Sequence, residues 1–397
     1  MAKSDLEEAR MRRSAHGIIC SHAGTLPQPE ALKQLIGGRY GLPRDEAEFE
    51  RLVPNAVAEV VKRQAEMGFA IVNDGEYGKK GGFSAYARSR LGGIEERPAG
   101  KTPAPRDITA RDARDFPALF AARRAADAAF RVNRPVFCTG PIRYVGEKEA
   151  RFDIDNLKAA VRGLDVEPFL PAIAPGTIEH WLRNAYYRDE EELLYAVADA
   201  MHEEYKVVTD AGIVLQIDDP DLPDGWQMYP EMSVAEYRRY AQLRVEALNH
   251  ALRGVPEDRV RLHVCWGSGH GPHKNDIAMR DIVDLVLRVK AECYSVEAAN
   301  PRHEHEWTVW REVKLPEGKT LMPGVVGHAS DVVEHPELVA QRLVRFANLV
   351  GRDNVIAGTD CGIGGRVGHD EIAWAKLEAL VEGARLATKA LWPAAAG

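Results

Sequence analysis

The sequence lacks a long apolar run: across its 397 residues, no stretch approaches the roughly 20 apolar residues that a membrane-spanning helix needs. Residues 1–13 are charged and lack the apolar core of a secretory signal peptide. Basic blocks are missing too, because 52 Lys and Arg residues are spread among 60 acidic residues and the formal net charge is -8. Nucleic-acid binding needs clustered positive charge, so we expect neither a nucleic acid nor a membrane as a partner.

Cysteine is scarce as well, with five residues in the whole chain. An odd and small number in a long chain does not indicate a disulfide framework. We therefore expect a cytoplasmic protein with reduced thiols, and we interpret Cys20, Cys138 and Cys293 as small core residues. The length and the 45% hydrophobic content allow a large buried core, in one barrel with insertions or in two modest domains.

Short apolar segments alternate with long amphipathic stretches, which is typical of a parallel sheet with helical crossovers. Apolar residues at helical spacing predict helices at residues 54–67, 191–211, 233–252, 279–291, 336–350 and 370–391. Strands are predicted at residues 17–22, 70–74, 135–139, 213–217, 260–265, 293–297, 321–326 and 354–359. Eight strands with helices between them favour an α/β fold, a single closed (β/α)8 TIM barrel with insertions, over the alternative of an open doubly wound sheet.

The expected barrel covers residues 16–397 and follows an N-terminal extension at residues 1–15. Two stretches interrupt its rhythm. Residues 92–118 are rich in Pro, Arg and Asp and are expected to form a surface excursion. Residues 165–190 contain several prolines and aromatic residues, and we expect them to form a lid over one end of the barrel.

Ionisable residues gather where the predicted strands end, and barrel enzymes keep their active sites at the C-terminal ends of their strands. These residues are His22 after the first strand, Glu76 after the second, Asp218 after the fourth, His263 and Cys265 at the fifth, Glu297 at the sixth and Cys361 after the eighth. Burying so many chargeable groups is costly unless they pair or bind a metal. The pattern therefore predicts a functional site at this end.

His263 and Cys265 are two residues apart on a predicted strand, so their side chains point to the same face. Glu297 and Cys361 add a carboxylate and a second thiolate, which completes a tetrahedral set that suits zinc. Thiolates disfavour magnesium and calcium, which prefer oxygen ligands. The position at the active end of a barrel favours catalysis over a structural role. Glu297 could yield to an incoming thiol, whose pKa the zinc would lower.

Three other features are weaker. The charged run at residues 303–306 is interpreted as a solvated loop. His270 and His273 follow the zinc strand and could support the ligands or touch the substrate. Arg366 lies in a glycine-rich loop after the last strand, where it could meet a carboxylate, sulfonate or phosphate group.

The order of these motifs over residues 16–392 resembles the cobalamin-independent methionine synthase family, specifically its C-terminal catalytic barrel. Epoxyalkane:coenzyme M transferase shares the barrel and the zinc motif. The matching motifs are Ser21-His22-Ala23-Gly24-Thr25-Leu26-Pro27, Asp74-Gly75-Glu76, Thr139-Gly140-Pro141, Gln216-Ile217-Asp218-Asp219-Pro220, His263-Val264-Cys265, Glu297 and Asp360-Cys361-Gly362.

The resemblance implies roles for individual residues. His263, Cys265, Glu297 and Cys361 match the zinc ligands of the family. Asp218 matches the carboxylate that holds the amino group of homocysteine, Glu76 matches a second contact to the amino acid, and the turn around His22 would lie close to the substrate backbone.

Several departures from the family bear on the substrates. Asp219 stands where the synthases have Glu, and the aromatic folate-stacking stretch is absent after Pro141. The chain has no room for the second, N-terminal barrel of the long synthases. The histidine expected as proton donor is displaced by one position, to His328, with Ala329 at the matching place.

The sequence thus predicts a zinc-dependent thiol alkyltransferase that transfers a methyl group to a thiol such as homocysteine, with His328 protonating the leaving group. One alternative is an epoxide–thiol transferase or lyase, and another is a non-catalytic barrel with a structural zinc. The expected partners are a small-molecule thiol and an alkyl donor. A homo-oligomer and a methyl-carrying corrinoid protein are further options that no feature of the sequence selects.

Overall fold

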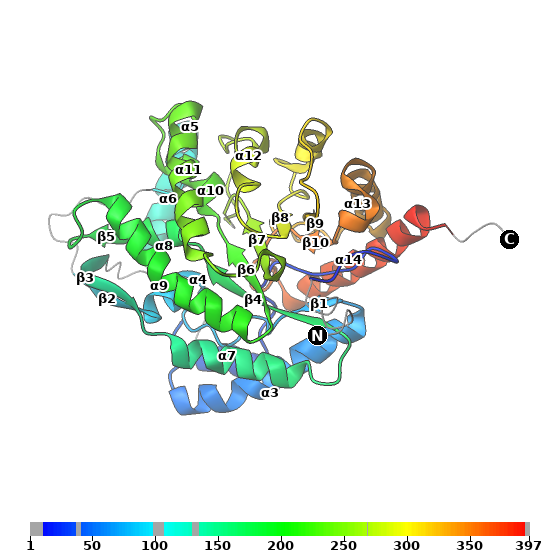
Figure 1. Cartoon of the computed structure of the whole chain (residues 1–397), viewed down its shortest axis with the longest axis horizontal. Helices are drawn as coiled ribbons and strands as arrows, with labels where there is room; N and C mark the ends of the chain where they lie inside the picture. The colour runs from blue at the N-terminus through cyan, green and yellow to red at the C-terminus, as the bar shows by residue number, and fades with distance from the viewer. Residues whose placement is uncertain (1–10, 37–40, 98–106, 129–134, 268, 394–397) are drawn as a thin grey trace.

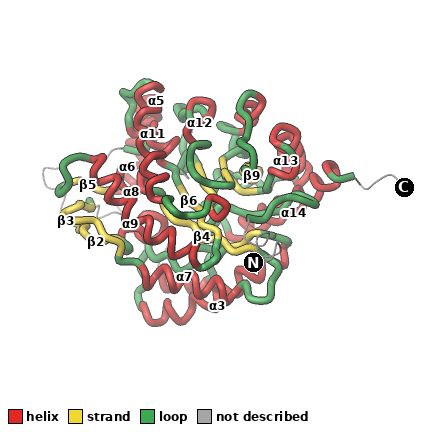
Figure 2. Tube along the Cα trace, in the orientation of Figure 1, coloured by secondary structure: helices red, strands yellow, loops and turns green. Residues whose placement is uncertain are grey.

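The computed structural model describes residues 11–36, 41–97, 107–128, 135–267 and 269–393. Its centre is a curled, parallel seven-stranded sheet in the order β1-β4-β6-β7-β8-β9-β10, surrounded by helices (Figures 1 and 2). The strands are β1 (Ile71–Val72), β4 (Glu167–Ile173), β6 (Val214–Asp218), β7 (Val260–Val264), β8 (Cys293–Val296), β9 (Thr320–Val326) and β10 (Gly358–Thr359). The prediction of an α/β fold built on a parallel sheet is confirmed.

The first predicted strand, residues 17–22, is an extended segment rather than a strand of this sheet. Cys20 forms one parallel bridge with Ala357, and Ser21 N donates to the Ala357 carbonyl (2.9 Å). On the other side, Ala70 N donates to the Cys20 carbonyl (3.2 Å). The segment therefore contacts both ends of the sheet, and full closure into an eight-stranded barrel stays a prediction.

The third strand predicted from the sequence, at residues 135–139, does not belong to the central sheet. Residues 136–139 lie instead in β3 (Val136–Tyr144) of a small second sheet, where β3 pairs with β2 (Leu91–Glu96) and β5 (Leu182–Asn184). The central sheet uses β4, which is part of the stretch expected as a lid. Pro168 and Pro171 make β4 hard to predict from the sequence, because proline has no backbone N–H to donate to a neighbouring strand. The Pro171 carbonyl accepts a hydrogen bond from the Lys79 ammonium.

Amphipathic helices cover the outside of the sheet, and five of the six predicted helices are found nearly as expected. They are α3 (Glu46–Met67), α9 (Glu190–Asp210), α11 (Val234–Ala251), α13 (Pro336–Val350) and α14 (Asp370–Leu391). A capping box between Ser233 and Glu236 fixes the start of α11, and the Asp45 side chain caps α3. In the sixth segment, 279–291, only the 3-10 helix η2 (Met279–Asp281) and the short α12 (Val283–Val286) form.

The remaining elements lie between these. They are α2 (Glu30–Ile36), α4 (Gly82–Ser89), α5 (Ala110–Asp115), α6 (Pro117–Ala128), α7 (Glu147–Ala160), α8 (Pro175–Glu179), α10 (Asp221–Met228), η1 (Glu257–Arg259), η3 (Glu304–Arg311) and η4 (Arg352–Asn354). Part of the predicted insertion 92–118 is ordered: from α5, Arg111 donates to the carbonyls of Trp226 and Tyr229 at the end of α10. Residues 98–106 of this insertion, and residues 1–10 of the predicted N-terminal extension, lie outside the described residues.

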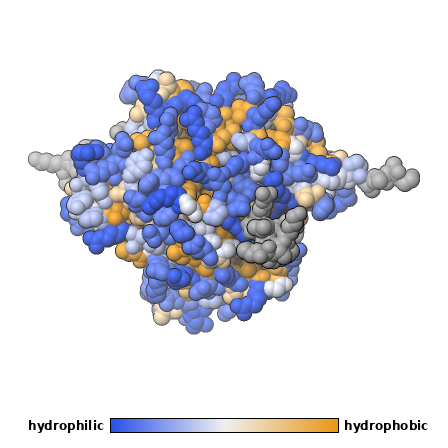
Figure 3. Space-filling view, in the orientation of Figure 1, coloured by the Kyte–Doolittle hydropathy of each residue, from blue (hydrophilic) through white to orange (hydrophobic). Residues whose placement is uncertain are grey.

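The core continues inside the curled sheet, where β1, β4, β6, β8 and β9 each contribute one buried apolar residue and a further one precedes β10. This cluster includes Ile71, Phe169, Val214, Cys293, Met322 and Ile356. All five cysteines are free and buried, as expected for Cys20, Cys138 and Cys293. Among the described helices, none is both long and apolar enough to cross a membrane. The face seen in Figure 3 is mostly hydrophilic, with scattered hydrophobic groups.

Candidate metal centre

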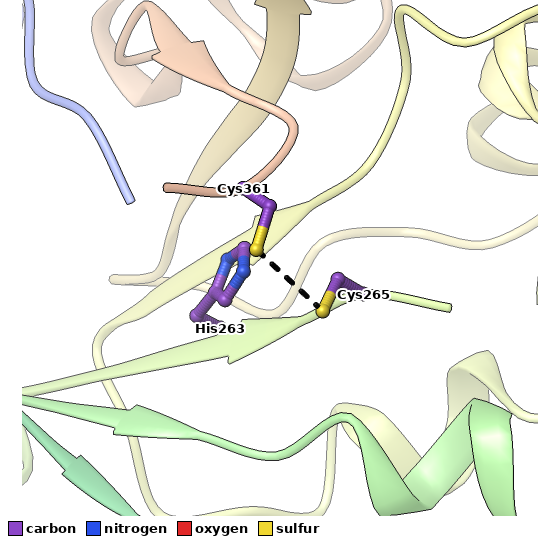
Figure 4. A group of neighbouring side chains, drawn as sticks. All are labelled: His263, Cys265 and Cys361. Carbon is purple, nitrogen blue, oxygen red and sulfur yellow. Dashed lines mark hydrogen bonds between the residues drawn. The ribbon is translucent and has the colours of Figure 1, made fainter. Parts of the chain in front are cut away.

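Three buried side chains form a candidate metal site at the C-terminal end of the sheet (Figure 4). His263 and Cys265 lie on the same face, at the end of β7 and directly after it, and Cys361 follows β10. One ligand atom from each lies within 4.8 Å of the other two. The Sγ atoms of Cys265 and Cys361 are 3.9 Å apart. The structure thus brings together three of the four predicted ligands.

The geometry of this cluster fits a zinc ion. Two sulfur atoms that each lie about 2.3 Å from one tetrahedral ion are about 3.8 Å apart, close to the observed separation of 3.9 Å. His263 Nδ1 is hydrogen-bonded to Ser295 Oγ (2.9 Å), which leaves Nε2 as the nitrogen available to a ligand. Nε2 is buried and has no hydrogen-bond partner within the described residues. A buried polar atom in this state is unusual unless something binds it.

Glu297, the fourth predicted ligand, lies beside the three-residue cluster rather than within it. Its Oε2 accepts a hydrogen bond from Asn300 Nδ2 (3.0 Å). Its Oε1 is buried without a hydrogen-bond partner among the described atoms, and lies 3.8 Å from Nδ1 of His328. The turn that follows Glu297 is held by Asp360, whose Oδ1 accepts from Ala298 N (2.8 Å) and Ala299 N (2.9 Å).

The charges of the site are poorly balanced. Hydrogen bonding to Cys265, helped by the nearby Arg366 guanidinium, holds the pKa of Cys361 well below the usual thiol range despite burial. The same sulfur–sulfur contact and burial raise the pKa of Cys265. Burial, together with the charges of Asp360 and Cys361, raises the pKa of Glu297 well above its usual range. A bound cation would relieve this accumulation of negative charge.

Asp218 stands next to the cluster, because it is the residue of β6 that pairs with His263 of β7. Burial raises the pKa of Asp218 to about 7, and the negative charge of Glu76 adds to the shift. Glu76 follows β1 in a left-handed backbone conformation (φ 63°), and its Oε2 accepts from Thr25 Oγ1 (3.0 Å). Gly24 permits this close approach, since a Cβ there would lie 2.2 Å from Glu76 Oε1.

The His22 side chain is enclosed by protein and its two nitrogens are both engaged. Nε2 is hydrogen-bonded to Gln64 Oε1 (2.8 Å), and Nδ1 accepts from Gly24 N (3.2 Å). Burial lowers the pKa of His22 to about 4, so the ring is neutral at neutral pH. His22 therefore shapes the turn that carries Gly24, and the structure does not bring its ring into the metal cluster.

His328 is also buried and lies next to the cluster. Burial lowers the pKa of His328 to about 4. Its Nδ1 makes no hydrogen bond to any described residue.

Sequence reasoning missed the residues that support the ligands. Ser295 holds His263, Asp360 holds the turn after Glu297, and Gln216 donates to Asp218. The alternation of side chains along β8 and β6 puts Ser295 and Gln216 on the same faces as Glu297 and Asp218, which lie two residues later, but it does not show which residues they support.

The solvated-loop interpretation of residues 303–306 is wrong for His303. This side chain is 2% exposed, stacks on Trp266 and is hydrogen-bonded to Asp276 and Glu306. The side chains of its partners Asp276 and Glu306 are buried with it, whereas His305 of the same run is exposed.

A curled parallel sheet with a histidine and two cysteines at its C-terminal end defines an α/β protein with a thiolate-rich candidate metal centre. Comparison with known families narrows this class. Residues 171–386, more than half of the chain, match the family described as the cobalamin-independent synthase catalytic domain, and the chain belongs to this family. The resemblance inferred from the motifs is thereby confirmed.

The curated relatives that the chain resembles are methionine synthases. The chain is 25% identical over 372 residues to a methionine synthase of Thermococcus kodakarensis, which covers 93% of both chains. It is 27% identical over 240 residues to a methionine synthase of Saccharolobus solfataricus, which covers 60% of each.

Solved structures agree on the fold. A B12-independent methionine synthase of a Shewanella species, in complex with selenomethionine, superposes with a TM-score of 0.70 at 20% identity, over 94% of this chain and 99% of that one. A putative B12-independent methionine synthase of Listeria monocytogenes gives a TM-score of 0.62 at 16% identity, over 93% and 97% of the two chains.

Proposed function

We propose that this protein is a zinc-dependent methyltransferase that acts on a thiol of the homocysteine type. His263, Cys265 and Cys361 would hold the zinc, with Glu297 as the fourth ligand. The observation that carries the proposal is the buried cluster itself, with its sulfur atoms 3.9 Å apart and with His263 Nε2 and Glu297 Oε1 lacking hydrogen-bond partners among the described residues. The methionine synthases among its relatives support the same reaction class.

Zinc at this site would lower the pKa of a thiol brought to it and so supply a thiolate at neutral pH. The surrounding residues prepare the site. Ser295 fixes the ring of His263 so that Nε2 faces the cluster. Glu297 is held through Oε2 by Asn300, so Oε1 would be the atom available to hold the metal and to give way to a thiol.

Asp218 and Glu76 are proposed to bind the ammonium group of the thiol substrate, with the turn at His22 against its backbone. Asp218 ends β6 beside the cluster and Glu76 follows β1, and the negative charge of Glu76 contributes to the raised pKa of Asp218. In the reaction, a sulfur–carbon bond forms while the bond between the methyl group and its donor breaks. The donor atom then takes a proton, for which buried His328 is the candidate source. Because burial holds the pKa of His328 at about 4 in the protein alone, this role requires nearby negative charge, such as that of Cys361, to raise the pKa during the reaction.

The domain organisation is part of the proposal. We infer that residues 16–397 form one barrel domain in which residues 17–22, an extended segment, take the place of the eighth strand. The hydrogen bonds of this segment to Ala357 on one side and Ala70 on the other support closure. Closure would place the turn at residues 22–25 between Glu76 and Cys361, where a substrate backbone could lie against it.

Zinc-edge X-ray absorption on the purified protein tests the function, with homocysteine, coenzyme M and glutathione added separately. We expect two sulfur neighbours of the metal in the protein alone and three after homocysteine is added. Cys265→Ser is the matched control and should show one fewer sulfur if any metal remains. A third sulfur that appears only with coenzyme M would favour the epoxide–thiol transferase. A shell that no thiol changes would make the zinc structural and would end the proposal.

A further inference from the structure

Arg261 is a charged side chain enclosed inside the curled sheet, one layer below the candidate metal site. It is 0% exposed and makes no ion pair with the residues that the structure describes. Its guanidinium lies over the ring of Phe169, with Cζ 4.0 Å from the ring centroid. Since a buried charge without a counter-ion is costly, the hydrogen bonds that Arg261 makes must satisfy the guanidinium.

Three of these hydrogen bonds lead to the site, and a fourth, from Nη1 to Met322 Sδ (3.5 Å), stays within the apolar core. Arg261 Nε donates to Gln216 Oε1 (2.8 Å) and Nη1 donates to Ser21 Oγ (2.8 Å). Nη2 donates to the His22 carbonyl (3.1 Å). Arg261 therefore ties β7 to β6 and to the turn that precedes Gly24.

Gln216 is fixed by this contact in one orientation. A glutamine amide has one accepting and one donating end, whereas a guanidinium only donates. The oxygen of Gln216 must face Arg261, so the NH2 group points the other way. There it donates to Asp218 Oδ1 (2.7 Å) and to the Ala23 carbonyl (2.9 Å).

We propose that Arg261 and Gln216 form a positioning pair that holds Asp218 in one orientation for the ammonium group of the thiol substrate. The pair occupies Oδ1 of Asp218, and Oδ2 is the oxygen left for the substrate. This inference rests on the proposed function, because it assigns to Asp218 the amino group of an amino thiol. Arg261 and Gln216 act through Asp218 and do not touch the substrate.

The strand register places the pair below the substrate and metal residues rather than among them. Gln216 pairs with Arg261 across β6 and β7, and Asp218 pairs with His263 two residues further along the strands. The positioning pair thus forms a layer beneath Asp218 and His263. A substrate held at Asp218 by its ammonium group would have its sulfur within reach of the cluster that contains His263.

Gln216→Glu tests the pair with almost no change in shape. A carboxylate there still accepts from Arg261 and gives it an ion-pair partner, but it turns an acceptor instead of a donor toward Asp218. Homocysteine is compared with 4-sulfanylbutanoate, which is the same thiol without its amino group. We expect the KM and Kd of homocysteine to rise at least about tenfold, the loss typical of a hydrogen bond to a charged group. The constants for 4-sulfanylbutanoate and the zinc content should stay within about twofold.

Ser21→Ala is the matched control, because it removes another hydrogen bond of Arg261 without touching Gln216, and it should leave the ratio of the two thiols unchanged. Gln216→Met, which buries no new charge, replaces Gln216→Glu if that variant does not fold. Equal losses for both thiols, or no loss for either, would overturn the positioning pair.

A crystal structure of Gln216→Glu gives a second result that needs no substrate. We expect the Asp218 carboxylate to turn away from residue 216, and an unmoved Asp218 would refute the pair. If the wild-type protein binds neither thiol, the proposed function fails. The position of Asp218 in this structure then still decides whether the pair exists.

Discussion

The hydrogen bond between Ser295 and His263 offers a sharp test of the metal centre. Ser295→Ala removes the hydroxyl that binds His263 Nδ1 at 2.9 Å, in a place where both residues are almost fully buried. The imidazole then loses the contact that fixes its orientation, and Nδ1 is left without a partner. Removing such a partner of a metal-binding histidine typically weakens metal affinity about 10–100-fold. We expect the zinc Kd of Ser295→Ala to rise by about tenfold or more.

Competition with a chromophoric chelator measures this Kd, and thermal unfolding of the zinc-free protein measures stability alongside it. Ser14→Ala is the control, since Ser14 is equally buried and its hydroxyl bonds to the Val355 carbonyl, outside the candidate metal centre. Both variants should lose about 1 kcal/mol of stability, but only Ser295→Ala should lose zinc affinity. If the two variants bind zinc equally well, His263 is not oriented by Ser295 and the ligand assignment is weakened.

Three further changes test the site and its surroundings. Cys265→Ser and Cys361→Ser should each lose the bound zinc and turnover together, as elemental analysis and a methyl-transfer assay would reveal. Asp360→Ala frees the two backbone N–H groups after Glu297 and should weaken zinc about tenfold, whereas Asp360→Asn, which keeps one accepting oxygen, should lose less by the same chelator assay. Against the opposing effect of burial, the hydrogen bond to Asp276 raises the pKa of His273 to about 9. A raised folded-state pKa gives stability that is full below about pH 6.5 and lost as the pH rises through 9. Denaturant unfolding of wild type and His273→Asn should therefore differ by about 3 kcal/mol at pH 6 and converge near pH 10.

The sequence predicted five of the helices that cover the sheet, and most of its strands, because their apolar periodicity survives in the folded protein. Prolines hid β4, although a parallel strand tolerates them where their carbonyls still find donors, as Pro171 does with Lys79. The prediction of the first strand was wrong for a different reason. Residues 17–22 have the composition of a strand, but Cys20 forms only a single isolated β-bridge, with Ala357.

The candidate ligands could be predicted because residue type alone limits their chemistry. Their supports could not, because a serine or a glutamine in a strand has many ordinary roles. Ser295 becomes informative only when the register places it opposite His263, and Gln216 only when Arg261 is opposite. The burial of His303 was unpredictable for the same reason, since its partner Asp276 lies 27 residues away in the sequence.

The buried acids of the site support our proposal that it binds two cationic groups, a metal ion and an ammonium group. Burial raises the pKa of Asp218 to about 7 and that of Asp360 to about 7, and it raises the pKa of Glu297 further. Each raised pKa means that the ionised form is destabilised in the protein alone and that a nearby positive charge would stabilise it. A metal ion beside Cys361 would stabilise Glu297, and in our proposal Oδ2 of Asp218 faces the thiol substrate and needs a second positive charge. In our proposal an ammonium group supplies that second charge, and an amino thiol would therefore fit the site better than a thiol without one.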